Sequence, residues 1–159
     1  MIAQLLRIIR TISLPITMLA VLTACGSNAS FQAESSNPGP GHQAATIALE
    51  QVGVPYRYGG ASPTGFDCSG LVQYAYSRAG LSVPRTTGQL WSAAKPVAQH
   101  ELTAGDLLFF SIEGKMSHVG MYLGERRFVH APQSGRSVSV ASLDAPFYRS
   151  ALIRAGRLY

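Results

Sequence analysis

A chain of 159 residues, 47% of them hydrophobic, is long enough for one domain with a single core. Its formal net charge is +5, from 13 Lys and Arg against 8 Asp and Glu, and the basic residues form no block. A charge this small and dispersed does not indicate a nucleic-acid-binding protein, and we expect no such partner.

The first 24 residues have the pattern of a secretory signal peptide. Arg7 and Arg10 make the start positive, residues 11–23 are mainly apolar, and the small residue Ala24 follows. The apolar run is shorter than the roughly 20 residues that a membrane-spanning helix needs. Residues 22–25 (Leu-Thr-Ala-Cys) also resemble the lipobox of bacterial lipoproteins, which implies cleavage before Cys25 and acylation of that residue. An ordinary exported protein cut near Ala24 is the alternative.

A lipidated Cys25 would place the protein in the cell envelope. Several acyl chains on one residue anchor a protein firmly in a bilayer. Gly26, rather than Asp, follows the cysteine. By resemblance, this favours the outer membrane of a Gram-negative cell, with the protein facing the periplasm. Without the signal peptide the chain keeps 13 − 2 = 11 basic and 8 acidic residues, a net charge of +3, which is compatible with an anionic wall polymer.

The mature chain divides into a tether and an α+β domain. Residues 25–41 are rich in Ser, Asn, Gly and Pro and predict a flexible tether, so the domain is expected at 42–159. Helices are predicted at 42–52, at 68–79 and from about 84 to 91, and strands at 107–111, 118–123, 127–131, 137–141 and 151–157. Short connections between the strands favour an antiparallel sheet of five to six strands, with the N-terminal helices packed on it.

Cys68 has the sequence context of a nucleophile. Asp67 is a favoured N-cap, so the thiol belongs to the first turn of a helix, where the positive end of the dipole favours a thiolate. The chain has two cysteines, and acylation of Cys25 would leave Cys68 without an intramolecular partner. A free thiol outside the cytoplasm indicates a reactive role; a small buried apolar residue is the alternative.

Two of the four histidines are suited to act as a base and its partner. His42 and His100 fall in polar surroundings, whereas His118 begins one predicted strand and His130 ends the next. A three-residue hairpin loop at 124–126 puts His118 and His130 diagonally on one face, about 7–8 Å apart at the backbone. A two-residue loop puts them on opposite faces, and each would then be an ordinary strand residue.

Six segments together resemble the NlpC family, which are papain-like cysteine peptidases of bacterial cell walls. They span about residues 44–157 in the family's order and spacing. The segments are 56–60 (Tyr-Arg-Tyr-Gly-Gly), 67–72 (Asp-Cys-Ser-Gly-Leu-Val), 84–87 (Pro-Arg-Thr-Thr), 105–110 (Gly-Asp-Leu-Leu-Phe-Phe), 117–122 (Ser-His-Val-Gly-Met-Tyr) and 128–131 (Phe-Val-His-Ala).

The resemblance implies roles for four residues. Cys68 would be the nucleophile, His118 its general base, and His130 the polar residue that orients His118. Tyr56 would lie beside the thiol and contribute to the oxyanion site. Since protonation of His130 would remove the acceptor for His118, we expect activity to fall below about pH 6, near the ordinary pKa of histidine.

The residues around Cys68 suggest further roles. Asp67 is best explained as a plain N-cap. Ser69 and Gly70 would let a substrate backbone approach the helix start. For Arg85 two roles are open: pairing with a substrate carboxylate, or with an internal acid such as Asp106.

The expected function is therefore that of a monomeric cell-wall cysteine endopeptidase. It would hydrolyse amide bonds in peptidoglycan stem peptides or cross-links through a thioester. No metal or other cofactor is expected, since the Cys and His positions lack the close spacing of zinc ligands. A catalytically silent wall-binding or scaffold lipoprotein of the same fold, and acyl transfer or amide hydrolysis on another exported substrate, are the alternatives.

Overall fold

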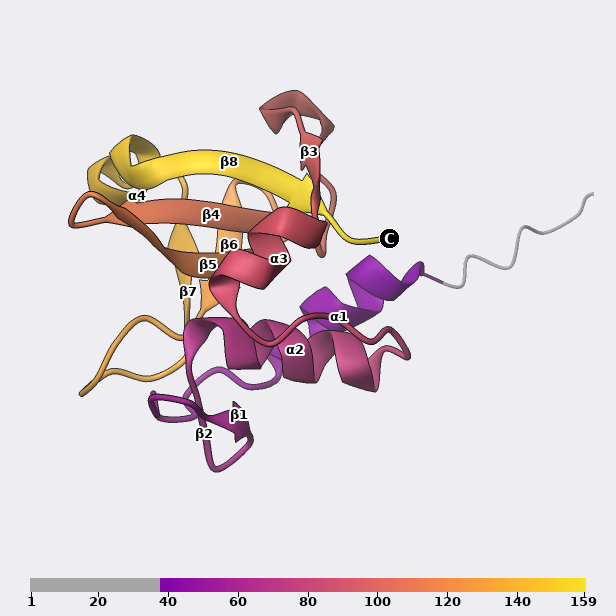
Figure 1. The fold of residues 1–159 in the computed structure, drawn as a ribbon, viewed down its shortest axis with the longest axis vertical. Coiled ribbons are helices and arrows are strands. Elements are labelled where there is room, and N and C mark those ends of the chain that lie inside the picture. Colours follow the sequence, from indigo (N-terminus) through magenta and orange to yellow (C-terminus); the bar gives the residue numbers. More distant parts are fainter. Residues whose placement is uncertain (1–37) are drawn as a thin grey trace, which may run out of the picture. The chain divides into compact units, whose positions relative to one another are not determined.

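The computed structural model describes residues 38–159, which are built around a six-stranded antiparallel sheet (Figure 1). In spatial order its strands are β3 (Lys95–Val97), β8 (Leu152–Arg157), β4 (Leu107–Ile112), β5 (Lys115–Gly124), β6 (Arg127–His130) and β7 (Ser139–Ser142). The predicted α+β class and antiparallel sheet are thus confirmed. The predicted signal peptide (1–24), Cys25 and residues 26–37 of the predicted tether lie outside the described residues.

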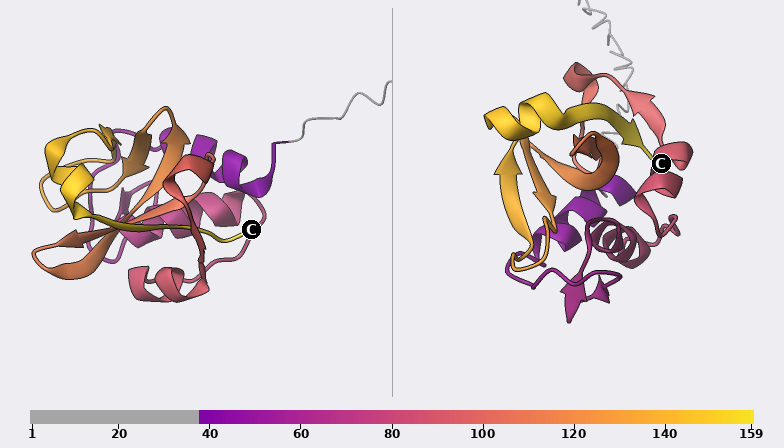
Figure 2. Two further views of the ribbon diagram at one scale, coloured as in Figure 1. Left: turned by 90° about the horizontal axis from the view of Figure 1, so that it is seen from above. Right: turned by 60° about the vertical axis from the view of Figure 1, so that its left-hand side comes forward.

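Three helices pack against one face of the sheet. Figures 1 and 2 show α1 (Pro40–Leu49), α2 (Cys68–Arg78) and α3 (Thr87–Ala93) on this side, and all three contact β5. A small hairpin of β1 (Ala61–Ser62) and β2 (Gly65–Phe66) directly precedes α2. The fourth helix, α4 (Pro146–Ala151), contacts β4.

The strands bury side chains on both of their faces. Alternate residues of β4 point to opposite sides, so Phe109 joins the core beneath the helices while Phe110 joins a second cluster with Phe128. Tyr148 of α4 packs against that second cluster. A sheet covered on both faces explains why four consecutive residues of β4 are buried.

The structure differs from the predicted elements mainly where the elements are short. The first helix begins at Pro40, because proline suits the first helical position, so two residues assigned to the tether lie in α1. Gly41 is buried there, and an added Cβ would overlap the ring of Tyr159. The strands β1–β3 and the helix α4 were not predicted, since segments of two to six residues show no clear periodicity. Among residues 38–159, no helix has the length and apolar character required to cross a membrane.

Candidate active site

Cys68 lies at the first position of α2, as predicted. Asp67 is extended (φ −92°, ψ 175°), and its Oδ1 accepts the Gly70 N–H at 2.6 Å, which confirms the N-cap. The thiol is free and half-buried. Its Sγ lies 3.7 Å from the Thr87 hydroxyl oxygen and 4.0 Å from the Ser117 carbonyl oxygen.

Asp67 does more than cap the helix, because it also holds Arg85. The guanidinium of Arg85 donates to both carboxylate oxygens, at 2.9 Å and 2.7 Å, and the Gly59 N–H donates at 3.0 Å. Burial alone would raise the pKa of Asp67, but these donors outweigh it and lower the pKa. The carboxylate therefore stays ionised beside the thiol, with its charge balanced by Arg85.

Arg85 pairs with an internal acid, which was one of the two roles left open for it, but that acid is Asp67 and not the suggested Asp106. Asp106 is fully buried and is paired with Arg157, whose Nε lies 2.7 Å from its Oδ1. Nothing in the sequence indicates whether Asp67 or Asp106 is the partner of Arg85. The pairing is determined by the fold.

The side chains that follow Cys68 serve internal contacts. The Ser69 hydroxyl is buried, donates to Asp67 Oδ1 at 3.3 Å and accepts from Arg85 at 2.9 Å. A Cβ on Gly70 would overlap the Gly60 carbonyl oxygen. Gly70 thus allows close packing of the chain on itself, and the expectation that it admits a substrate backbone is not needed to explain it.

The hairpin between β5 and β6 brings the two histidines to one face. Its turn has two residues, because Gly124 pairs with Arg127, and this is the case that was expected to put the histidines on opposite faces. However, the register shifts between Tyr122 and Gly124, and Tyr122 still pairs with Phe128. This irregularity restores the register that a three-residue loop would have produced.

His118 and His130 form a direct, buried hydrogen bond. His118 Nε2 lies 2.8 Å from His130 Nδ1, and both side chains are almost inaccessible to solvent. Burial lowers the pKa of His118 to about 4, and burial together with the charge of His118 lowers that of His130 to about 3. Both rings are therefore neutral near pH 7, and the fall in activity expected near pH 6 moves towards pH 4.

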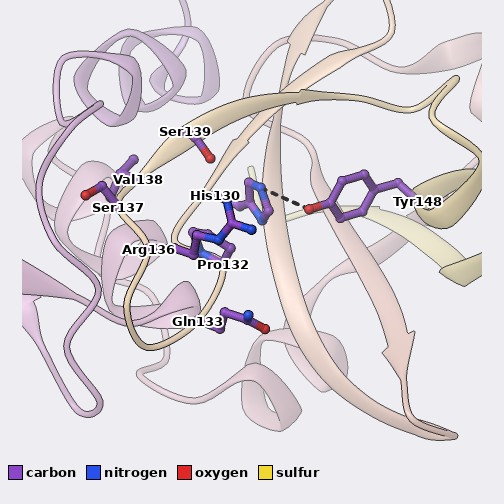
Figure 3. A pocket seen from close by; sticks show the side chains of 8 residues that line it. All are labelled: His130, Pro132, Gln133, Arg136, Ser137, Val138, Ser139 and Tyr148. Carbon is purple, nitrogen blue, oxygen red and sulfur yellow. Dashed lines mark hydrogen bonds between the residues drawn. The ribbon is translucent and has the colours of Figure 1, made fainter.

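The hydrogen-bonding pattern determines which nitrogen is left to take a proton. Because His118 Nε2 is bonded to His130, Nδ1 is the nitrogen of His118 that remains for a thiol. If Nε2 of His118 donates, His130 must accept at Nδ1 and carry its own proton on Nε2. Nε2 of His130 lies 3.4 Å from the Tyr148 hydroxyl, which is placed to accept that proton (Figure 3).

Cys68, His118, His130 and Tyr56 line one hollow, which we call the central cavity, of about 240 Å³. Tyr56 has a raised pKa, through burial and then the proximity of Cys68 and Asp67, so its phenol keeps its proton. The structure therefore brings the three predicted catalytic residues and the predicted oxyanion residue together.

Two further cavities continue from the central one. The Arg85 cavity, of about 490 Å³, shares Tyr56, Cys68 and Ser117 with it and contains both Ser69 and Arg85. The Arg136 cavity, of about 460 Å³, shares His130, Pro132, Gln133 and Tyr148 with it. Cys68 thus lies within a row of three hollows.

The sequence did not point to several residues of these cavities. Thr87, whose hydroxyl lies beside the thiol, belongs to the segment 84–87, but the sequence indicates no role for it. Tyr148 and Phe147 belong to the unpredicted α4, and Arg136 lies in the irregular connection between β6 and β7. In residues 38–159, no group of three or more His, Cys, Asp or Glu side chains is placed to hold a metal ion.

An α+β fold with a thiol at a helix start and a histidine pair on the adjoining sheet defines the papain-like class. Within it, the chain belongs to the NlpC/P60 family, whose sequence profile matches residues 53–157. The predicted family resemblance is therefore confirmed.

Similar proteins include cell-wall enzymes. Murein DD-endopeptidase MepH of Escherichia coli K12 is 40% identical over 116 residues, which cover 69% of this chain and 43% of MepH. Bifunctional muramidase/DL-endopeptidase CwlT of Bacillus subtilis 168 is 43% identical over 115 residues, 70% of this chain and 34% of CwlT. The chain thus matches less than half the length of either relative.

Solved structures agree on the fold. The NlpC/p60 domain of the peptidoglycan hydrolase SagA is 36% identical, with a TM-score of 0.64, and the match covers 74% of this chain and 97% of that domain. A lipoprotein-like NLP/P60 family protein of Staphylococcus aureus Mu50 is 37% identical, with a TM-score of 0.65, over 75% of this chain and 41% of that one.

Proposed function

We propose that this protein is a cysteine endopeptidase that hydrolyses amide bonds in the peptides of peptidoglycan. The observation that carries the proposal is that Cys68 and the hydrogen-bonded pair His118–His130 line one cavity. Relatives named as murein and DL-endopeptidases support peptidoglycan as the substrate. Their names differ in the bond cleaved, so the proposal covers both stem peptides and cross-links.

The first half of the reaction forms a thioester. Nδ1 of His118 takes the proton of the Cys68 thiol, and the thiolate attacks the carbonyl carbon of the scissile amide. The oxyanion accepts hydrogen bonds from N–H groups at the start of α2 and from the Tyr56 hydroxyl. His118 then returns its proton to the amine as the C–N bond breaks, which leaves the acyl group on Cys68.

The second half regenerates the enzyme. Water attacks the thioester while His118 takes its proton, and the thiolate leaves and is reprotonated. His130 orients His118 by accepting its Nε2–H, so His118 returns to the same neutral tautomer each time it gives up the proton on Nδ1. No group outside the chain is needed to balance the protons.

A digestion experiment tests the proposal. Purified peptidoglycan is incubated with the protein and with Cys68→Ala, and the released fragments are identified by mass spectrometry. We expect amine and carboxyl termini to appear in equal amounts with the wild type and none with the variant. Binding to the wall without fragments from either protein would instead support the silent scaffold.

We also propose that acylated Cys25 anchors the protein to a bilayer, in the outer membrane and facing the periplasm. The support is the lipobox-like sequence at residues 22–25 and the Gly that follows it. Residues 26–39 would then separate the anchor from α1 and allow a monomer to reach the wall. Mass spectrometry of the mature N-terminus tests this: an unmodified Cys25, or cleavage elsewhere, would reject the anchor.

A further inference from the structure

The Arg136 cavity offers positive charge next to the catalytic histidines. Figure 3 shows the side chain of Arg136 directed towards His130, and the hydroxyl of Tyr148 directed towards the same ring. Burial raises the pKa of Tyr148, and the positive charge of Arg136 opposes that rise, which is consistent with a guanidinium close to the phenol. Gln133, Ser137 and Ser139 add polar groups to the lining.

Arg136 has no acidic partner among residues 38–159, unlike several other arginines. Arg85, Arg126, Arg127 and Arg157 each form an ion pair with a carboxylate. No Asp or Glu of the described residues lines the Arg136 cavity; Glu113 lines the central cavity only. An arginine that lines a hollow without an internal carboxylate is available for an external one.

The backbone of Arg136 is fixed to the active site. Its carbonyl oxygen accepts the Tyr56 N–H at 2.8 Å, and its own N–H donates to Gln133 at 3.1 Å. The neighbouring Ser137 forms an isolated β-bridge with Pro55. Since Tyr56 also lines the central cavity, the position of Arg136 is tied to that of the thiol.

The chemistry decides which part of a substrate reaches this cavity. In the proposed reaction the departing amine takes its proton from His118, so the amine fragment lies on the histidine side of Cys68. From the central cavity that side continues into the Arg136 cavity, while the Arg85 cavity adjoins the opposite end of the thiol region. In a peptide, the fragment that leaves as an amine carries the C-terminal carboxylate.

We propose that Arg136 binds a carboxylate of the leaving-amine fragment, and that the Arg136 cavity thereby selects peptides with negative charge on that side of the cleaved bond. Glu113 in the central cavity disfavours the carboxylate closer to the thiol, so the charge is placed one hollow further along. This inference rests on the proposed function for its direction, but the binding itself does not require turnover.

Two matched peptides test the inference. One is a stem peptide with a free C-terminal carboxylate, and the other is the same peptide as its C-terminal carboxamide. With the wild type we expect kcat/KM to be about tenfold higher for the carboxylate, the size of one charged hydrogen bond to a partly exposed group. Arg136→Gln should cleave both peptides at the carboxamide rate, and Arg136→Lys should keep part of the preference.

The control is Arg78→Gln, which removes an exposed arginine from α2 that lines a different cavity. It should keep the full preference for the carboxylate. Circular dichroism and thermal unfolding of Arg136→Gln establish that the fold is retained. An unchanged preference in folded Arg136→Gln, or equal rates for both peptides with the wild type, would overturn the inference while leaving the endopeptidase intact.

A binding measurement separates the inference from the proposed function. Calorimetry is performed with Cys68→Ala, with and without Arg136→Gln, and with the same two peptides. We expect Cys68→Ala to bind the carboxylate about tenfold more tightly, and the double variant to bind both equally. If the wild type cleaves neither peptide, the endopeptidase proposal fails for these peptides, and equal affinities in Cys68→Ala would reject the role of Arg136 independently.

Discussion

The hollows on the two sides of Cys68 each contain an arginine, and the two arginines are in opposite electrostatic situations. On one side Arg85 donates to both oxygens of Asp67 and to Ser69, so its charge is neutralised by an internal carboxylate. On the other side Arg136 lines a cavity beside neutral His130 and has no carboxylate partner among the described residues. The same residue type thus supports the scaffold of the helix start at one site and is free to meet a ligand at the other.

Removal of His118 should have the largest effect, because it takes away the proposed general base. We expect His118→Ala to lower the rate of peptide hydrolysis about 1000-fold. Alkylation of Cys68 by iodoacetamide at pH 7 should also slow, since no imidazole remains to take the thiol proton.

The matched control is His100→Ala, an exposed histidine in the short 3₁₀ helix at Gln99–Glu101. It should leave both rates unchanged. Hydrolysis by His118→Ala at the rate of the control would mean that another group activates the thiol.

The pH dependence of stability should distinguish the two histidines from Asp67, because these groups titrate in different pH ranges. Both histidines have pKa values lowered by burial, so the unfolded chain binds protons that the folded chain does not as pH falls below about 6.5. Stability is therefore complete above pH 6.5 and is lost towards pH 4, by about 1.4 kcal/mol per pH unit for each histidine. Asp67 acts in the same sense but in a lower pH range: its lowered pKa contributes stability that is lost only below about pH 4.

Urea unfolding between pH 7 and pH 4 measures this, with His130→Asn as the comparison. The variant should show a shallower loss across this range, because one titrating group is gone. An equally steep loss would exclude His130 as the source. The pH profile of kcat/KM should likewise hold to about pH 4, and a fall centred near pH 6 would show that the imidazoles titrate normally.

The two arginines should differ clearly in their contribution to folding. Arg85→Met leaves the largely buried Asp67 carboxylate without its countercharge, so we expect a loss of about 2 kcal/mol in the free energy of unfolding. Arg136→Met should change it by less than about 0.5 kcal/mol, since no internal ion pair is broken.

Denaturant unfolding at pH 7 compares the two variants, and Asp67→Asn together with Asp67→Asn/Arg85→Met completes a double-mutant cycle. The double variant should be more stable than Arg85→Met alone, because no uncompensated charge remains. Equal losses of unfolding free energy in Arg85→Met and Arg136→Met would remove the distinction between the Arg85 cavity and the Arg136 cavity.

The parts of this site that the sequence predicted are those encoded by local signals. An N-cap Asp followed by an apolar run predicted the start of α2 and hence the place of Cys68. Strand periodicity left two arrangements of the histidines, on one face or on opposite faces according to the length of the turn. The structure has a two-residue turn with a register shift, and the histidines lie on one face. The cap of Asp67 and the position of Cys68 depend on residues within one helical turn.

Contacts between distant segments could not be predicted in this way. Asp67 and Arg85 are 18 residues apart, and no periodicity specifies that they meet; the internal acid that the sequence suggested was Asp106. The depression of the histidine pKa values comes from burial, and one side chain packed against His130 is Tyr148 of α4, a six-residue helix without a clear pattern. Arg136 lies in an irregular connection whose position is set by hydrogen bonds to residues far away in the sequence.

The smallest expected effect concerns Tyr148, which touches His130 and not the reacting atoms, and so acts as a positioning residue. Its hydroxyl lies 3.4 Å from His130 Nε2, and it is suited to hold the proton on that nitrogen. Tyr148→Phe should lower kcat only about three- to tenfold, the value of one neutral hydrogen bond, with KM nearly unchanged. Because the phenol also fixes the tautomer, the acid limb of the pH profile should shift, which a purely structural contact would not cause.

Phe147→Leu, at the exposed neighbouring position, is the control and should leave the acid limb in place. An unshifted limb in Tyr148→Phe would restrict Tyr148 to packing against Phe110 and Phe128.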